Sequence, residues 1–289
     1  MAAPDQQLRP RPAHPGAPST EVHDREEVGD RTSARLWDED LTGFIATSPQ
    51  DPPAWRRYCD ALHLELLRRW APTEPIDRAL KTDLFDEAAG TGLADALSTT
   101  SKQVVGIDLS TTAAVAAHRR GVRDAVRADV RRLPFADHAF ELVVSNSTLD
   151  HLPDAAAIDE ALAELLRVTQ PGGTAIITLD NPRCPTVALR AVLPERWLRA
   201  TGLIPYEMGA TLSLSALARA VERVGFRVEE RTTYMHVLRV TALRSAGRSR
   251  NPDEWVERSL ERERRARRST AQLTGHFVAV RAVRPGGRG

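Results

Sequence analysis

The sequence predicts an α/β fold in which a doubly wound parallel sheet is covered by helices on both faces. Short, continuous apolar runs alternate with helical stretches from residue 81 onward, three of these runs end in an acid, and a glycine-rich turn follows the first. Such runs are typical of strands that are buried on both faces of a parallel sheet. With 289 residues, 42% of them apolar, the chain can build a large core.

The predicted elements follow in order along the chain. A first helix is predicted over residues 53–70, where Trp55, Tyr58 and Leu62 recur on one face. The strands predicted next cover 82–85, 103–108, 125–129, 140–146 and 173–180, with helices over 110–120 and 155–168, the second stopped by the "QPGG" stretch. The C-terminal third predicts a helix over 214–224 ending at Gly225, a strand over 227–240, a charged helix over 253–268 and a last strand over 276–283.

Composition divides the chain into three parts. Residues 1–35 are rich in proline and charge and are expected to be a disordered tail, because they have too little apolar surface to offset the entropy of ordering. Residues 36–80 are expected to form a helical cap, and residues 81–289 the main domain. An apolar, proline-containing insert at about 181–212 is expected to be a lid over the substrate.

Charge and cysteine content exclude several classes of protein. The 40 Lys and Arg residues balance 39 Asp and Glu residues, which argues against a dedicated nucleic-acid binder. The two cysteines lie far apart, so neither a disulfide framework nor a structural zinc site is expected, and a cytoplasmic location is predicted. No run of about 18 apolar residues predicts a membrane span.

The residues that follow the predicted strands are the candidates for a ligand site, because ligands bind beyond the carboxyl ends of strands in an open parallel sheet. These candidates are Asp86, Ala88, Gly90, Gly92, Asp108, Leu109, Asp129, Val130, Ser145 and Asn146. The two glycines allow a sharp turn and a close approach of the backbone to a ligand. The alternative is that the three acids only cap helices, as Asp often does in such loops.

The acids indicate what the turn would hold. Asp108 is placed to accept hydrogen bonds from ribose hydroxyls, and Asp129 to accept one from the adenine amine. A carboxylate at Asp86 would repel a pyrophosphate but attract an ammonium group. We therefore expect adenosine joined to a cationic group without phosphates, which fits S-adenosylmethionine.

The same stretches resemble class I S-adenosylmethionine-dependent methyltransferases of the small-molecule branch. The family's first motif is similar to "DEAAGTG" at 86–92, with Ala88 in place of the first glycine, and the acid after the second strand is Asp108 in "VVGIDLS". The stretches "RADVRRLPFADHAFELVVSN", "LDHLPD" and "LLRVTQPGGTAIIT" are also similar, in the same order. The resemblance implies a seven-stranded, mostly parallel sheet with the last strand antiparallel.

His151 is the candidate catalytic residue. It follows the fourth predicted strand, where a methyl acceptor should approach, and a neutral imidazole there could take a proton from a hydroxyl or amine. The alternative is a histidine that only packs beneath the loop.

The expected function is therefore methyl transfer from S-adenosylmethionine to a small-molecule acceptor, such as a specialised metabolite, a quinone or a lipid-like compound. Two alternatives stay open at this stage. One is a protein that binds the cofactor without catalysis, and the other is a nicotinamide-dependent oxidoreductase, which Asp86 and Asp95 in the turn disfavour.

Overall fold

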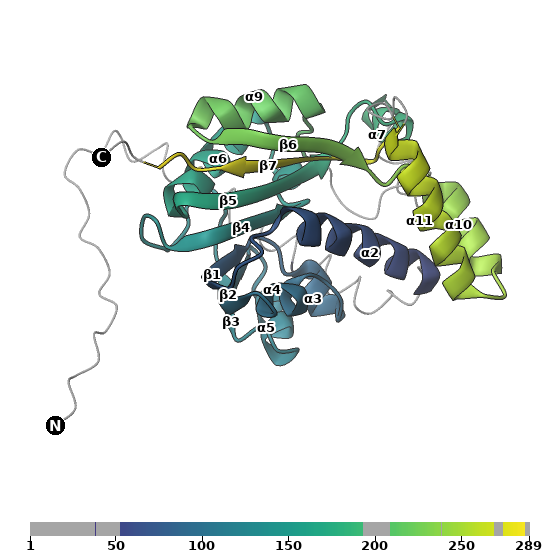
Figure 1. Ribbon diagram of the computed structural model, residues 1–289, viewed down its shortest axis with the longest axis horizontal. Coiled ribbons are helices and arrows are strands. Elements are labelled where there is room, and N and C mark those ends of the chain that lie inside the picture. Colours follow the sequence, from purple (N-terminus) through teal and green to yellow (C-terminus); the bar gives the residue numbers. More distant parts are fainter. Residues whose placement is uncertain (1–37, 39–52, 193–208, 238, 269–273, 287–289) are drawn as a thin grey trace.

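A computed structural model describes residues 38, 53–192, 209–237, 239–268 and 274–286, and its centre is a seven-stranded sheet. The strands lie in the order β3-β2-β1-β4-β5-β7-β6 (Figure 1). Their bounds are β1 Ile76–Lys81, β2 Ser101–Asp108, β3 Asp124–Arg127, β4 Phe140–Asn146, β5 Thr169–Asp180, β6 Arg227–Tyr234 and β7 Phe277–Val283. The order reverses at β1, which places a ligand-binding crevice at the carboxyl ends of the central strands.

The strand directions confirm the mostly parallel sheet. β1 pairs in parallel with β2 and β4, as do β2 with β3 and β4 with β5. β7 runs antiparallel to both of its neighbours, β5 and β6. The last strand is therefore inserted between two strands that precede it in the chain.

Helices cover both faces of the sheet. They are α2 Pro53–Trp70, α3 Phe85–Ala89, α4 Ala94–Ser98, α5 Thr111–Arg119, the 3-10 helix η2 Leu149–His151, α6 Ala155–Val168, α7 Pro185–Val192, α9 Leu214–Val224, α10 Arg239–Arg248 and α11 Pro252–Arg268. Leu142 and Val144 of β4 belong to the core that includes α2, whereas Val143 between them belongs to the core of α6 and α9. This alternation is what a strand buried on both faces requires.

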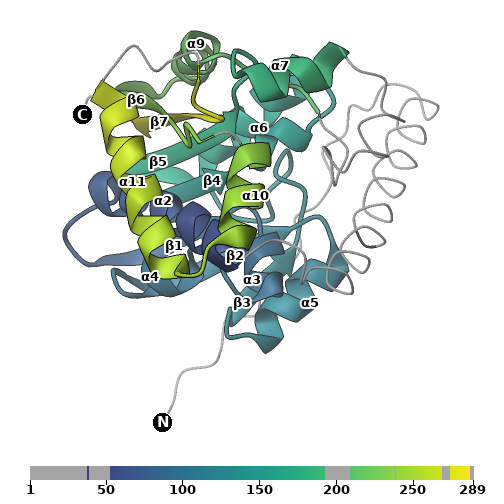
Figure 2. The same cartoon turned by 90° about the vertical axis from the view of Figure 1, so that its right-hand side faces the viewer.

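Three helices that are distant in sequence lie together on the α2 side. α2 contacts both α10 and α11, and Figure 2 shows the pair of C-terminal helices beside it. Tyr58 of α2 meets Trp255 of α11 with ring centroids 5.9 Å apart, and its hydroxyl donates to Glu263 at 3.1 Å. Helix α2 matches its predicted bounds, and its predicted apolar face is the face that is buried.

The prediction of a first strand at 82–85 is wrong. Strand β1 is Ile76–Lys81, and Phe85 begins a helix instead. The sequence conceals this strand because it ends in Lys81, a charged residue that the fold buries by pairing it with Glu87. β1 also begins inside the segment 36–80 that composition assigns to the cap.

Two further element boundaries differ from prediction. Helix α6 ends at Val168 as predicted, but strand β5 begins at Thr169 rather than at residue 173. The "QPGG" stretch therefore lies within β5, where Gly172 and Gly173 exchange backbone hydrogen bonds with Arg284. The predicted strand over 227–240 ends at Tyr234, and Arg239 begins α10. The tail at 1–35 and most of the insert at 181–212 lie outside the described residues.

Candidate active site

One edge of the sheet gathers the predicted site residues. The carboxyl ends of β1, β2, β4, β5 and β6 meet there, because these strands are parallel. β7 runs the other way, so its first residue, Phe277, lies at this edge beside Asp180 of β5 and Tyr234 of β6. The start of the last strand thus joins the ends of the others.

The glycine-rich turn connects two short helices, α3 and α4. Gly90 has a φ of 91° and closes α3, and Gly92 has a φ of 102°, which L-residues rarely adopt. A Cβ on Gly92 would lie 2.4 Å from a carboxylate oxygen of Glu87. The predicted sharp turn is present, and its nearest neighbour is a carboxylate of the chain itself.

Ala88 has a packing role. It is 1% exposed on α3 and forms a small apolar cluster with Ala113 of α5. Because the chain is helical here, position 88 does not need the backbone freedom of the glycine found in the family motif. A methyl group fits between the two helices.

Asp86 lies in the first turn of α3 and is half-buried. The prediction placed it at the end of a strand, which is wrong, but it is close to other acids. Electrostatic interactions connect it with Asp60 and His63 of α2 and with Asp83 and Lys81. We call Asp60, Asp83, Asp86, Glu87 and Asp108 the acidic cluster.

A buried lysine lies at the centre of the acidic cluster. The Lys81 ammonium is 2.8 Å from Glu87 Oε2 and also donates to the carbonyl oxygen of Asp83. Glu87 Oε1 accepts from the amides of Leu93 and Ala94 at 2.9 and 3.1 Å. Burial alone would lower the pKa of Lys81, but the surrounding carboxylates raise it, so the ammonium stays charged.

The acidic cluster holds more negative charge than Lys81 can balance. Burial, together with the charges of Asp86 and Glu87, raises the pKa of Asp60 to about 6 against the opposing effect of Arg56. Burial and the neighbouring acids also raise the pKa of Asp83. Raised carboxyl pKa values of this kind are relieved by a cation.

Asp108 ends β2 and is held by two backbone amides. Its Oδ1 accepts from Ser110 at 2.7 Å, and its Oδ2 accepts from Leu84 at 3.0 Å. Burial raises the pKa of this carboxyl, although these amides, Lys81 and His151 act in the opposite direction. Asp108 itself does not cap α5, because Ser110 supplies the capping hydroxyl. Leu109 lies between them, half-buried.

Asp129 follows β3 and is paired with Arg131. Its oxygens accept from the Arg131 backbone amide at 2.8 Å and from the guanidinium at 2.6 Å. The carboxylate is thus fixed in position, with the adjacent Val130 buried in the core. It does not cap a helix in the described structure.

The end of β4 supplies two buried polar residues. The Asn146 side chain accepts from the Thr178 hydroxyl at 3.0 Å, which ties β4 to β5. The Ser145 hydroxyl is buried, with no hydrogen-bond partner among the described residues. A buried polar atom of this kind requires a partner, and a ligand can provide it.

His151 lies in η2, half-buried, within electrostatic reach of both Asp108 and Asp150. The preceding Asp150 is buried, and its Oδ2 accepts from the Ser147 hydroxyl at 2.8 Å and from the Asp180 amide at 3.1 Å. Its Oδ1 has no hydrogen-bond partner among the described residues. His151 thus interacts with the acid that ends β2 and with Asp150, which is bonded to the end of β5.

Sequence reasoning missed a second group of polar residues at this edge. Asp180 ends β5, and its Oδ1 lies 3.2 Å from Nε2 of His276, which precedes β7. The thiol of Cys184 is hydrogen-bonded to His276 as well. Asp180 carried the same signal as Asp108, an acid at the end of an apolar run, whereas His276 could be placed only from the antiparallel direction of β7.

The insert is anchored to the His151 turn where it returns to the described structure. The Gly209 amide donates to the Asp150 carbonyl at 2.8 Å, and the Ala210 amide donates to the Leu152 carbonyl at 2.7 Å. A Cβ on Gly209 would lie 2.1 Å from the Leu152 carbonyl oxygen, so only glycine fits this approach.

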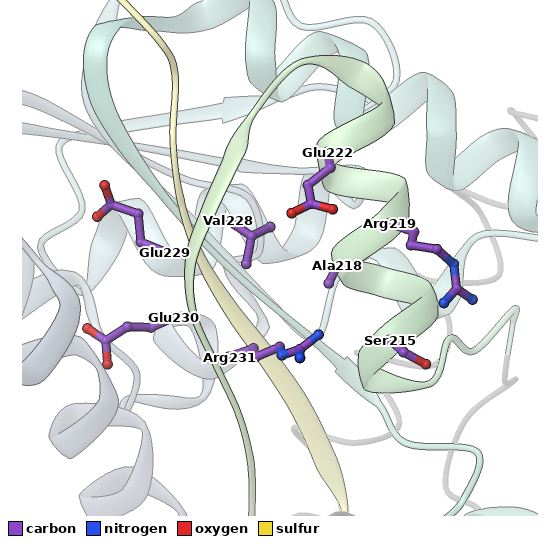
Figure 3. Close-up of a pocket in the computed structure, with 8 residues that line it drawn as sticks. All are labelled: Ser215, Ala218, Arg219, Glu222, Val228, Glu229, Glu230 and Arg231. Carbon is purple, nitrogen blue, oxygen red and sulfur yellow. The ribbon is translucent and has the colours of Figure 1, made fainter.

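A surface hollow lies elsewhere, between α9 and the first half of the edge strand β6. It encloses about 310 Å³, and Figure 3 shows Glu222, Val228 and Arg231 pointing into the space between the two elements. This is the opposite half of β6 from the end that joins the site. We therefore do not assign the hollow to the site.

The described residues contain neither a membrane-spanning helix nor a metal-binding group. No described helix has the length and apolar character that a bilayer crossing requires. No group of three His, Cys, Asp or Glu residues in the described part of the chain is arranged to hold a metal ion.

Comparisons with known proteins agree with this geometry. Residues 85–177 match the family model described as a methyltransferase domain. A demethylmenaquinone methyltransferase of Beutenbergia cavernae is 36% identical over 122 residues, covering 41% of this chain and 50% of the relative. One from Mycobacterium marinum is 34% identical over 160 residues, covering 55% and 61%. The chain thus spans only about half to three fifths of the length of the curated relatives it matches.

Solved structures share the fold at low sequence identity. The [4+2]-cyclase SpnF aligns with a TM-score of 0.57 and 19% identity, covering 89% of this chain and 97% of the other. The N-methyltransferase NodS from Bradyrhizobium japonicum, in complex with S-adenosylhomocysteine, aligns with a TM-score of 0.51 and 16% identity, covering 86% and 98%. The chain has the same fold as these proteins, and the matched model assigns residues 85–177 to a methyltransferase domain, in agreement with the resemblance that the sequence motifs carry.

Proposed function

We propose that the protein transfers a methyl group from S-adenosylmethionine to a small-molecule acceptor at the edge formed by the carboxyl ends of β1, β2, β4 and β5. The acidic cluster carries this proposal. Lys81 is the buried ammonium at the centre of this cluster; burial raises the pKa values of Asp60, Asp83 and Asp108, and repulsion between the acids adds to the rise at Asp60 and Asp83. Such a site favours a cationic ligand and disfavours a pyrophosphate.

The described residues fit the parts of this cofactor. Asp108, fixed by two amides, would accept hydrogen bonds from the ribose hydroxyls, and Asp129, fixed by Arg131, would accept one from the adenine amine. Asp86 and the turn at Gly90 and Gly92 would hold the aminoacyl end. When bound, S-adenosylmethionine supplies a methyl group on a positively charged sulfur.

The chain's own residues would orient the acceptor and accept its proton. His151 interacts electrostatically with Asp108 on the proposed cofactor side and with the neighbouring Asp150. We assign it as the general base for an acceptor hydroxyl or amine. The Ser145 hydroxyl and Asp150 Oδ1, buried without partners among the described residues, would hydrogen-bond to the acceptor. The insert at 181–212, anchored through Gly209, would close over it.

The names of the relatives favour one class of acceptor. Several curated relatives are named demethylmenaquinone methyltransferases, so a quinone-type ring is the acceptor class we propose first. Because the chain spans only part of each relative, this inference applies to the matched region. A second candidate is a different reaction on the same fold, since SpnF shares the fold and is named a [4+2]-cyclase.

Two measurements test the proposal. Isothermal titration should show micromolar binding of S-adenosylhomocysteine and none of NAD, and NAD binding alone would overturn the cofactor assignment. Incubation with S-adenosylmethionine and reduced 2-unsubstituted naphthoquinones should yield a product heavier by one CH2 group. Cofactor binding without any methylated product from these and other small-molecule acceptors would favour the second candidate.

A further inference from the structure

Three side chains from separate parts of the chain form a connected array at the acceptor side of the sheet edge. Asp180 ends β5, His276 precedes β7, and Cys184 immediately precedes α7. The His276 imidazole is 3.2 Å from the Asp180 carboxylate and is hydrogen-bonded to the Cys184 thiol. The order is carboxylate, imidazole, thiol, which is the arrangement that activates a nucleophile.

The surroundings of the thiol favour its ionised form. Cys184 stands at the amino end of the eight-residue helix α7, where its carbonyl accepts the first helical bond from Ala188. Its Sγ is 3.2 Å from the Thr186 hydroxyl, which can donate to a thiolate; the Thr274 carbonyl, 3.7 Å away, accepts from the neutral thiol and acts in the opposite direction. Burial alone would raise the pKa of this thiol, but the hydrogen bonds to His276 and Thr186 stabilise the thiolate and lower the pKa to about 7.

The array is distinct from the residues assigned to methyl transfer, and it adjoins them. The Asp180 amide donates to Asp150, whose second carboxylate oxygen has no partner among the described residues. An unpartnered oxygen in a buried carboxylate indicates that a ligand reaches this edge. Because the described residues contain no metal-type grouping, the array is not explained as a metal site.

We propose that Cys184, activated by His276 and Asp180, is a nucleophilic thiol that forms covalent adducts with soft electrophiles of the conjugated-carbonyl class. The thiolate sulfur bonds to the β-carbon, the carbon–carbon double bond opens, and its electron pair moves to the carbonyl oxygen, which takes a proton. With a quinone, the carbon that gained sulfur then loses its proton and the second carbonyl oxygen takes one, so the product is a thioether of the hydroquinone and no further oxidant is required. This chemistry depends on the array alone and stands whether or not the methyl transfer proposed above is correct.

The thiol is 1% exposed, so a reagent reaches it through a local opening. The pH dependence of the rate distinguishes two kinds of opening. If the contact with His276 persists while the reagent enters, the rate follows the lowered thiol pKa. If access requires unfolding, the rate has the pH dependence of an ordinary thiol, whose pKa is about 8.5.

The experiment uses the native full chain and iodoacetamide, with the alkylated peptides quantified by mass spectrometry from pH 5.5 to 9.5. Cys59, which is half-buried on α2, is the internal control. We expect the Cys184 rate to reach half its maximum near pH 7 and the Cys59 rate to keep rising above pH 8. A Cys184 midpoint equal to that of Cys59, or no alkylation of Cys184 in the folded chain, would overturn the proposal.

Two further measurements identify the cause and the electrophile class. His276→Gln should slow alkylation of Cys184 at pH 7 by about fivefold, as expected when a thiol pKa near 7 rises by about one unit, and leave the rate at Cys59 unchanged. If that variant does not fold, Asp180→Asn provides the same comparison through a weaker effect in the same direction. 1,4-naphthoquinone should add to Cys184 in preference to Cys59, and an adduct confined to Cys59 would exclude the conjugated-carbonyl class.

Discussion

The cofactor end and the acceptor end of the sheet edge hold their charged groups in different ways. At the ends of β2 and β3, Asp108 and Asp129 each accept from an amide two residues away in sequence, and Asp108 also accepts from Leu84 within the same half of the sheet. At the end of β5, the Asn181 side chain bonds to Gly275, 94 residues away, and Asp180 faces His276. The first end is built from local turns and the second from the meeting of distant strands.

This difference explains what the sequence could predict. The turn with Gly90 and Gly92 and the acid of β2 leave a short-range pattern, so both could be found from spacing. The Asp180–His276 contact leaves no such pattern, because it exists only once β7 is placed antiparallel beside β5. The alternation of apolar runs likewise predicted most elements, but β1 was misplaced because its last residue, Lys81, is a buried charge.

The largest expected effect tests the acceptor end. His151→Ala should lower kcat by about 10²–10⁴-fold, the loss typical of a general base, and leave the affinity for S-adenosylhomocysteine unchanged. The measurement is a pH–rate profile for both proteins with a confirmed acceptor. The wild-type profile should have a limb that is absent in the variant. Identical profiles would show that His151 is not the general base.

The next effect tests the cofactor end through its buried ion pair. Lys81→Ala leaves the Glu87 carboxylate buried without its cation and should lower the free energy of unfolding by about 3–5 kcal/mol. Urea denaturation measures the loss. The matched control is Lys102→Ala, which breaks an exposed pair with Asp77 and should cost far less, because solvent screens that pair. Equal losses in the two variants would mean that the buried pair contributes no more than a surface one.

Asp108 distinguishes a ligand-binding acid from a merely structural one. Asp108→Ala should weaken binding of S-adenosylhomocysteine by about 2–3 kcal/mol, because two charge-assisted hydrogen bonds to the ribose are lost. Asp124→Ala, at the exposed start of β3, is the control and should bind as the wild type does. A folded Asp108 variant with unchanged affinity would assign the residue to turn structure alone.

The smallest effect concerns the repulsion among the acids. Because the pKa of Asp60 is raised from 3.8 to about 6, the folded state holds this proton more tightly than the unfolded state. Its contribution to stability therefore falls as the pH rises from about 4 to 6 and stays unfavourable above that range. Asp60→Asn should stabilise the protein at pH 7.5 by roughly 1 kcal/mol, after allowance for solvent screening, and have little effect at pH 4.

Thermal unfolding at the two pH values measures this gain. The control is Asp95→Asn on the exposed surface of α4, which should shift stability by no more than about 0.5 kcal/mol at either pH. A gain at pH 4 as large as that at pH 7.5 would show that Asp60 acts through packing rather than through charge.

The position of β7 has a consequence for the order of assembly. It is the last strand of the described chain, yet it lies between β5 and β6 and pairs along its whole length with β5. Until it is made, β5 and β6 each have an open edge, and open edges recruit other chains. The acceptor side, with His276 at the start of this strand, is therefore completed after the cofactor side during synthesis. A chain that stops before residue 276 would keep the matched methyltransferase region but expose two adhesive strands, so we expect it to aggregate.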